Sequence, residues 1–131
     1  MSDETRQAIT VGPWPDRYTF VPALRVGRTV FISGTTAADE DGRIAAPGDV
    51  VEQTRQIFRK FERLLGAAGG SCDDIVQTVD YITTTENYRS TAAVRREFFK
   101  VARPTSTGVL VAGLLREGAV IEVSAVAVLR G

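Results

Sequence analysis

Histidine is absent from this sequence of 131 residues, and cysteine and methionine occur once each. Without histidine, a Ser-His triad and imidazole acid–base catalysis are excluded, and so are nearly all zinc and iron sites. The lone cysteine, Cys72, cannot form an intramolecular disulfide, which is typical of a reducing compartment. We therefore expect a cytoplasmic protein without a metal, whose chemistry relies on carboxylates, hydroxyls, arginines, backbone amides and bound water.

Long apolar runs, glycine-rich phosphate loops and an excess of either charge are also missing. The apolar stretch from Ile121 to Leu129 is far too short to span a bilayer, and the polar N-terminus MSDETRQ does not resemble a signal peptide. Sixteen basic residues balance sixteen acidic ones, so we expect no nucleic-acid or membrane partner. No phosphate-binding motif supports a nucleotide cofactor, and none is predicted.

The length and the ordinary share of hydrophobic residues, 44%, predict a single domain over residues 1–131. Apolar residues at helical spacing predict a helix over 51–68, with Asp49 and Glu52 as a capping box and Gly69-Gly70 at its end. A second helix is expected over 90–102, stopped by Pro104. Strands are expected over 8–11, 20–25, 29–33, 75–83, 107–112 and 120–129. This order predicts an α+β fold with one mixed β-sheet and two helices packed on one face.

Both faces of the last predicted strand are largely apolar. Ile121, Val123, Ala125, Ala127 and Leu129 form one face, whereas Val120, Glu122, Ser124, Val126 and Val128 form the other. A sheet covered by helices on one side should be polar on its open side. The pattern therefore favours self-association through the second face, with coverage by loops as the alternative.

Several segments, taken in order, resemble the Rid (YjgF) family over about residues 11–129. They are VFISGT at 30–35, the end of the long helix at 65–70 (LGAAGG), DIVQT at 74–78, RREFF at 95–99, Arg103-Pro104, and VIEVSAVA at 120–127. The resemblance implies a chorismate-mutase-like fold and a homotrimer whose sheets surround a central barrel-like core. It also implies a ligand pocket at each subunit interface. The best-known members hydrolyse reactive imines and enamines derived from amino acids and release ammonia.

The sequence departs from the deaminating members at the positions that carry their activity. Their substrate-binding arginine is matched by Ser106, and the glutamate that positions the attacking water is matched by Ser124. A tyrosine near the first hairpin is matched by Phe20, whereas the pocket glycine is retained as Gly34. A hydroxyl cannot replace a bidentate arginine–carboxylate pair, so the resemblance implies a rebuilt pocket with changed specificity.

The predicted site follows from these matches. Ser106, Ser124 and Glu122 are the candidate catalytic residues, although Ser124 and Glu122 could instead be packing or ion-pairing residues of the assembly. Trp14 and Tyr18 lie in a proline-rich loop, where they either line the pocket or anchor the loop. Arg95 and Arg96 are expected to be solvated, and the acids beside Cys72 to raise the pKa of its thiol. The candidate substrate-binding residues are Trp14, Tyr18, Phe20, Gly34, Arg103, Thr107 and Gly108.

Two classes of function remain open at this point. The first is a hydrolase or deaminase that acts on an imine, enamine or related small metabolite in an intersubunit pocket, without a cofactor. The second is a non-catalytic trimer that binds a small molecule or serves as a scaffold. A ribonuclease role, described for some family members, has little support because the chain is neutral and lacks histidine.

Overall fold

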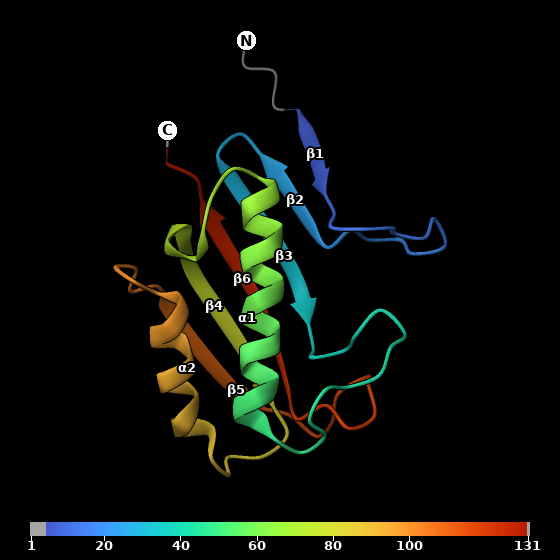
Figure 1. Cartoon of the computed structure of the whole chain (residues 1–131), viewed down its shortest axis with the longest axis vertical. Helices are drawn as coiled ribbons and strands as arrows, with labels where there is room; N and C mark the ends of the chain where they lie inside the picture. Colours follow the sequence, from blue (N-terminus) through green and yellow to red (C-terminus); the bar gives the residue numbers. More distant parts are fainter. Residues whose placement is uncertain (1–4, 131) are drawn as a thin grey trace.

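The computed structural model describes residues 5–130 and contains one six-stranded sheet with two α-helices (Figure 1). Within this range, no helix is both long enough and apolar enough to cross a membrane. The elements in chain order are β1 (Arg6–Ile9), β2 (Ala23–Val26), β3 (Thr29–Thr35), α1 (Val50–Ala67), the 3₁₀ turn η1 (Cys72–Asp74), β4 (Ile75–Ile82), the 3₁₀ turn η2 (Tyr88–Ser90), α2 (Thr91–Phe98), β5 (Thr105–Leu110) and β6 (Ile121–Val128).

The strands are ordered β1-β2-β3-β6-β4-β5, and only β4 and β5 run parallel. Both helices lie on the same face of the sheet in Figure 1, which confirms the predicted mixed sheet with helices on one side. Gly27 and Arg28 join β2 to β3 in a tight hairpin, and Gly27 has a φ of 61°.

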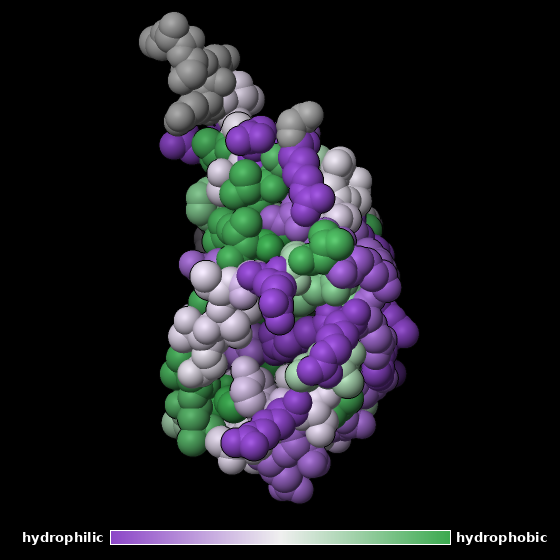
Figure 2. All heavy atoms as spheres, turned by 90° about the vertical axis from the view of Figure 1, so that its left-hand side faces the viewer, coloured by the Kyte–Doolittle hydropathy of each residue, from purple (hydrophilic) through white to green (hydrophobic). Residues whose placement is uncertain are grey.

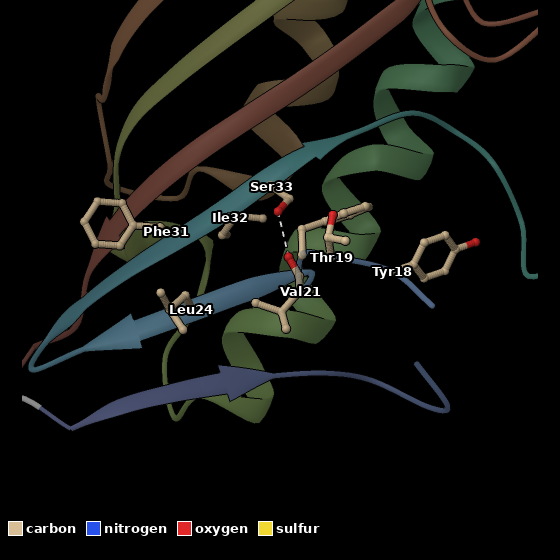
Figure 3. Close-up of a pocket in the computed structure, with 8 residues that line it drawn as sticks. Tyr18, Thr19, Val21, Leu24, Phe31, Ile32 and Ser33 are labelled. Atoms are coloured by element: carbon tan, nitrogen blue, oxygen red, sulfur yellow. Dashed lines mark hydrogen bonds between the residues drawn. The ribbon is translucent and has the colours of Figure 1, made fainter. Parts of the chain in front are cut away.

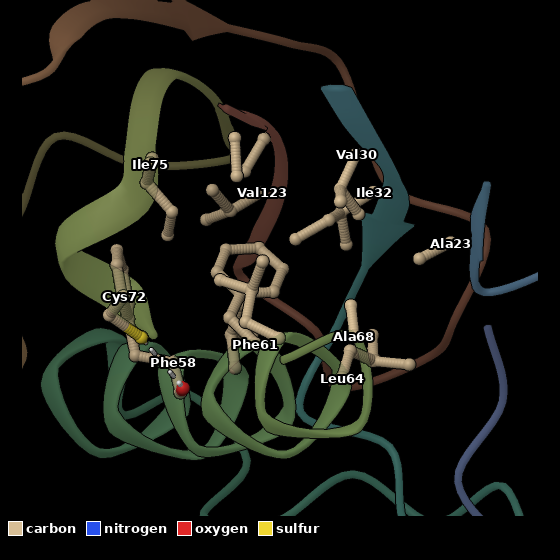
Figure 4. Packing of buried hydrophobic residues seen from close by; sticks show 14 of the residues in the cluster. Ala23, Val30, Ile32, Phe58, Phe61, Leu64, Ala68, Cys72, Ile75 and Val123 are labelled. Carbon is tan, nitrogen blue, oxygen red and sulfur yellow. Dashed lines mark hydrogen bonds between the residues drawn. The ribbon is translucent and has the colours of Figure 1, made fainter. Parts of the chain in front are cut away.

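The core lies between α1 and the sheet, and its packing is shown in Figure 4. Asp49 caps α1 by accepting a hydrogen bond of 3.0 Å from the backbone N–H of Glu52. At the other end of α1, Gly69 follows the C-cap with a φ of 88°, the left-handed conformation that commonly terminates a helix. Each large apolar side chain buried here contributes about 2–3 kcal/mol to folding. The buried residues of α1 are Val50, Gln53, Thr54, Ile57, Phe58, Phe61, Leu64 and Leu65.

The second helix is shorter than predicted, because α2 ends at Phe98 and not at Ala102. A side chain from another element accounts for the early end. Asp73 Oδ1 accepts hydrogen bonds from the backbone N–H groups of Val101 and Ala102, each of 3.0 Å, which removes these donors from a helix. Val101, which falls inside the predicted helix, consequently lies outside α2 and is exposed.

The strand boundaries also differ from expectation at the N-terminal end. The first strand covers residues 6–9 rather than 8–11, and β2 begins at Ala23, so Phe20 lies in the preceding loop. In β4 the register shifts between Ile75 and Gln77, which leaves Val76 exposed next to the buried Ile75. A bulge of this kind reverses the side-chain alternation and cannot be recognised from periodicity.

The two faces of the sheet are unequal in the way the alternation of the last strand predicts. Along β6, residues that face the helices are buried, whereas those between them are half-exposed. Figure 2 shows the molecule from the side of α2: hydrophilic residues cover the helix layer, and hydrophobic residues gather along the opposite edge. Among the exposed apolar residues of that opposite face are Phe31 and Val109.

Candidate functional site on the uncovered face

A β-bulge in β3 marks the centre of the candidate site. Ile32 pairs with Ala125 and Thr35 pairs with Val123, so Ser33 and Gly34 together oppose the single residue Ser124. Bulges of this type re-aim side chains and are frequent beside active sites. Here the bulge brings Gly34 and Ser124, two residues selected from the sequence, to the same place.

Gly34 lies directly against the carboxylate of Glu122. A Cβ atom built on residue 34 would be only 2.6 Å from Glu122 Oε2, so the absence of a side chain leaves room for the acid. Within residues 5–130, no arginine or lysine forms a salt bridge with Glu122. The site therefore contains a half-exposed carboxylate that is available to a ligand or to another chain.

The strands beside β6 complete this face. Glu122 pairs with Tyr81 of β4, and Ser124 pairs with Val79, which in turn pairs with Thr107 of β5. Paired residues face the same side of a sheet, so Thr107 and Ser124 share the uncovered face, two strands apart. This arrangement brings together Glu122, Ser124, Gly34 and Thr107 from the predicted set.

The loop before β2 carries a cluster of three aromatic rings. The Trp14 and Tyr18 ring centroids are 4.8 Å apart, and each of these rings is 5.5 Å from Phe20. Trp14 Nε1 also donates a hydrogen bond of 2.7 Å to the carbonyl oxygen of Phe20, which closes the loop. Both groups belong to the loop, so this contact holds the Trp14 ring within the loop itself.

Tyr18 and Phe20 line a shallow groove of about 610 Å³ that continues onto β2 and β3 (Figure 3). Its floor holds Leu24 and Phe31, and the Ser33 hydroxyl donates a hydrogen bond of 2.7 Å to the carbonyl oxygen of Val21. Because Ser33 belongs to the β3 bulge, the apolar groove begins beside Gly34. It is suited to an apolar part of a ligand.

The remaining predicted residues lie on the other side of the sheet. Ser106 pairs with Thr78, and Gly108 pairs with Asp80; both partners are buried under the helices. A Cβ atom on Gly108 would be 3.1 Å from the Tyr88 hydroxyl, which places its Cα on the helix side. Within one chain, therefore, Ser106, Gly108 and the neighbouring Arg103 are not brought together with Ser124 and Glu122.

A buried ion pair, which the sequence pattern did not predict, connects α2 to β4. Arg95 Nη2 donates to Asp80 Oδ2 over 2.6 Å, and the Tyr88 hydroxyl donates to the same oxygen over 2.5 Å. Arg95 was predicted to be solvated, which is wrong, since its side chain is only 16% exposed and Asp80 is fully buried. Burial, together with the adjacent Asp80 carboxylate, raises the pKa of Tyr88 to about 12. Helical spacing alone gave no sign of a partner 15 residues away.

Two further titratable groups have shifted pKa values. Burial, reinforced by Glu62 and Asp73, raises the pKa of the Cys72 thiol to about 12; the predicted direction is confirmed, but burial is the main cause. Lys60 was not selected from the sequence. Its Nζ donates to the Thr36 carbonyl oxygen (2.6 Å) and to Thr35 Oγ1 (3.2 Å), and burial lowers its pKa to about 8. Lys60 thus fixes the segment immediately after Gly34.

The uncovered face presents the Glu122 carboxylate, the Ser124 and Thr107 hydroxyls and the backbone groups of the β3 bulge. No cluster of three or more potential metal ligands occurs in residues 5–130. A carboxylate next to an exposed backbone segment can accept a proton from water or return it to a leaving group. Such a set can assist addition of water to a polarised carbon.

Together, the sheet with one helix-covered face and the site at the β3 bulge define a small α+β domain of the chorismate-mutase-like type. The chain belongs to the endoribonuclease L-PSP family, also called the YjgF/YER057c/UK114 or Rid family, whose model matches residues 15–129. This confirms the family resemblance found in the sequence.

Comparison with individual proteins supports the assignment. The 3-aminoacrylate deaminase RutC of Acinetobacter baylyi is 31% identical over 116 residues, which cover 88% of this chain and 91% of RutC. A crystal structure from Thermotoga maritima, described as a candidate endoribonuclease, matches with a TM-score of 0.84 and 28% identity, over 95% of this chain and 98% of that one. A YjgF/YER057c/UK114 member from Mycobacterium tuberculosis gives 0.79 and 29%, over 95% and 100%.

Proposed function

We propose that this protein is a deaminase that hydrolyses a reactive imine or enamine of a small metabolite in pockets between the subunits of a homotrimer. The observation that carries the proposal is the Glu122 carboxylate, which lies against Gly34 at the β3 bulge without a cationic partner in the described chain. The 31% identity with RutC, a 3-aminoacrylate deaminase, supports the reaction class.

The reaction requires only water and proton transfers. Water adds to the carbon of a protonated C=N bond, a proton moves from the added water to the nitrogen, and the C–N bond breaks to give a carbonyl compound and ammonium. An enamine enters the same sequence after a proton is added to its β-carbon. In this proposal Glu122 accepts the proton from the attacking water, and the Ser124 hydroxyl donates a hydrogen bond in the same pocket.

The uncovered face supports the homotrimer. Phe31 is 49% exposed there, next to half-exposed Val126 on β6. A contiguous apolar face of a sheet is typically covered by another chain. A neighbouring copy also supplies a way to complete the site, because Ser106 and Arg103 of one chain lie on the opposite side of the sheet from Glu122 and Ser124.

The specificity is expected to differ from that of enzymes for simple 2-imino acids. The arginine and glutamate positions of those enzymes hold Ser106 and Ser124, and the groove beside the bulge is lined by Phe20, Leu24 and Phe31. We therefore favour a substrate with an apolar part that fits this groove.

The decisive experiment measures ammonia released from 3-aminoacrylate, 2-iminopropionate and bulkier apolar imines, each generated in situ. We expect the wild-type protein to accelerate release from at least one, and Glu122→Gln to lower the rate at least tenfold. Glu86→Gln, which removes the same charge from an exposed turn, serves as the control. Ammonia release at the uncatalysed rate for every substrate, from protein shown to be folded and trimeric, would contradict the proposal.

A further inference from the structure

The chain contains one half-buried amine that the proposed reaction does not use. Of its sixteen basic residues, only Lys60 and Lys100 are lysines. Lys100 is exposed, whereas Lys60 is half-buried on α1 and its amine reaches the end of β3. A lysine amine becomes a nucleophile when it loses its proton, which an arginine does not do in proteins. Lys60 therefore lies where its surroundings can change its chemistry.

The hydrogen-bond acceptors of Lys60 are neutral. Its Nζ atom donates to the Thr36 carbonyl oxygen over 2.6 Å and to Thr35 Oγ1 over 3.2 Å. Within residues 5–130, no carboxylate forms a salt bridge with this amine. A neutral amine keeps two N–H donors, so both contacts can persist after Lys60 loses a proton.

The charged residues around Lys60 disfavour its ammonium form on balance. Arg63 lies three residues further along α1, where side chains are neighbours, and Arg116 belongs to the loop before β6. Asp39, in the loop after β3, acts in the opposite direction, but its carboxylate already accepts backbone N–H groups of its own turn. Burial, followed by Arg63 and Arg116, lowers the pKa of Lys60 to about 8.

These surroundings favour a reaction that turns the amine into an anion. At pH 7.5 an amine with this pKa is neutral in about a quarter of the molecules, against about one in a thousand at the ordinary value of 10.5. No carboxylate of the described chain forms a salt bridge with Arg63 or Arg116, so negative charge is favoured beside them. Lys60 also lies outside the apolar groove, and its partial burial favours a small electrophile.

We propose that Lys60 reacts reversibly with carbon dioxide to form a carbamate. The lone pair of the neutral Nζ forms a bond to carbon, one π pair of carbon dioxide moves to oxygen, and the nitrogen loses a proton to water. Arg63 and Arg116 stabilise the negative charge of the product.

The hydrogen bonds of Lys60 suit the carbamate as well. Its remaining N–H group still donates to the Thr36 carbonyl oxygen, and the Thr35 hydroxyl changes from acceptor to donor toward a carbamate oxygen. This proposal does not depend on deamination at Glu122, because the carbamate can be measured in a protein that releases no ammonia.

The test is carbon-13 NMR of the full chain, in buffer equilibrated with isotopically labelled carbon dioxide near neutral pH. We expect a carbamate resonance from the wild type that is absent in Lys60→Arg and retained in Lys100→Arg. The α-amino group of the chain also forms a carbamate, but its resonance is common to all three proteins. Lys60→Arg keeps the cation and the N–H donors, and circular dichroism checks that it is folded.

Alkylation of the carbamate with a trialkyloxonium salt, followed by peptide mass spectrometry, locates the modified residue. Lys60 should carry the carbamate with about tenfold higher occupancy than Lys100, because far more of its amine is neutral. Equal occupancy of the two lysines, or an unchanged resonance in Lys60→Arg, would overturn the proposal.

Arg63→Met tests the contribution of the surrounding charge. It should lower the occupancy at Lys60 severalfold, because both the neutral amine and the anionic product lose a stabilising cation. Arg59→Met is the matched control, since it removes the same charge from an exposed position of α1 next to Lys60, and adjacent residues on a helix do not face each other. Equal occupancy in the two variants would overturn the role proposed for the arginine.

Discussion

The carboxylate of Glu122 on β6 occupies the space that a side chain at Gly34 on β3 would need, with Oε2 only 2.6 Å from the position of a Cβ atom. The two residues belong to different strands, and the bulge at Ser33 and Gly34 brings them together. This contact links an irregularity of the backbone to the acid for which a catalytic role is proposed.

Gly34→Ala should therefore affect activity far more than stability. The φ angle of Gly34 is not positive, and the atoms it would displace are at the end of a flexible side chain, so the fold should tolerate the methyl group. We expect a change in unfolding free energy below about 1 kcal/mol and at least a tenfold lower rate of ammonia release, because the carboxylate is displaced.

Gly66→Ala is the matched control for that substitution. Gly66 is exposed in the last turn of α1, and a Cβ atom there would meet no atom within 4 Å. It should stabilise the fold by up to about 1 kcal/mol and leave activity unchanged. Equal activity of the two variants would contradict the role assigned to the contact between Gly34 and Glu122.

Asp80 is the residue whose loss should damage the fold most. It is fully buried and accepts from both Arg95 and Tyr88 through one oxygen. We expect Asp80→Ala to destabilise the protein by about 3–5 kcal/mol, since Arg95 would keep a charge without a partner. Tyr88→Phe should cost about 1–2 kcal/mol. Urea unfolding monitored by circular dichroism measures the loss of unfolding free energy in both variants.

The double variant Asp80→Leu/Arg95→Met separates the ion pair from its burial. Replacement of a buried pair by apolar residues of similar size is often neutral or stabilising. The double variant should accordingly recover most of the stability lost in Asp80→Ala. A double variant that is less stable than Asp80→Ala would show that the pair itself stabilises the packing of α2 on β4.

The features that could be predicted from the sequence depend on local pattern. The long apolar stripe and the cap at Asp49 determine α1, and the alternation in β6 correctly indicated that the sheet has a second apolar face. Contacts between distant residues could not be predicted in this way. Asp73, which binds the backbone just after α2, is 28 residues from Val101 in the sequence. Asp80 forms a buried ion pair with Arg95, a residue that helical spacing alone places on the solvent side.

The candidate site shows the same limit. Motif matching selected Gly34, Ser124 and Glu122, which lie together on one face, but it also selected Ser106, which lies on the other. A motif contains no information on which way a side chain points until the register of the strands is known. Lys60 was missed because its hydrogen-bond acceptors, including the Thr36 carbonyl oxygen, are backbone or hydroxyl oxygens rather than an acid.

Lys60 should make the stability of the fold depend on pH in the alkaline range. Its pKa is about 8 in the folded protein and 10.5 when unfolded, so the unfolded chain binds more protons between these values. Stability must then rise with pH over this range, as the cost of the buried charge disappears. Lys60→Met should lack this contribution, and its stability relative to the wild type should fall from pH 8 to 10.5.

The comparison uses urea unfolding of both proteins at several pH values. Other groups that titrate in this range, Cys72 among them, are common to both proteins and cancel in the difference. Only the slope of the difference is informative, because Lys60→Met also removes the hydrogen bond to the Thr36 carbonyl oxygen. A difference that is constant across the range would mean that Lys60 titrates normally in the folded state.

Phe31→Glu should dissociate the proposed trimer without unfolding the chain. Its ring is 49% exposed on the uncovered face, so a carboxylate there costs the monomer little, whereas three charges buried against apolar neighbours would strongly disfavour assembly. Sedimentation equilibrium should show a trimer for the wild type and a folded monomer for Phe31→Glu. Leu115→Glu, at a residue that is 99% exposed in a loop, should remain trimeric.

Ammonia release should disappear with the trimer, because a pocket between subunits cannot form in one chain. A variant that stays trimeric, or a wild-type protein that is monomeric, would mean that another partner covers this face.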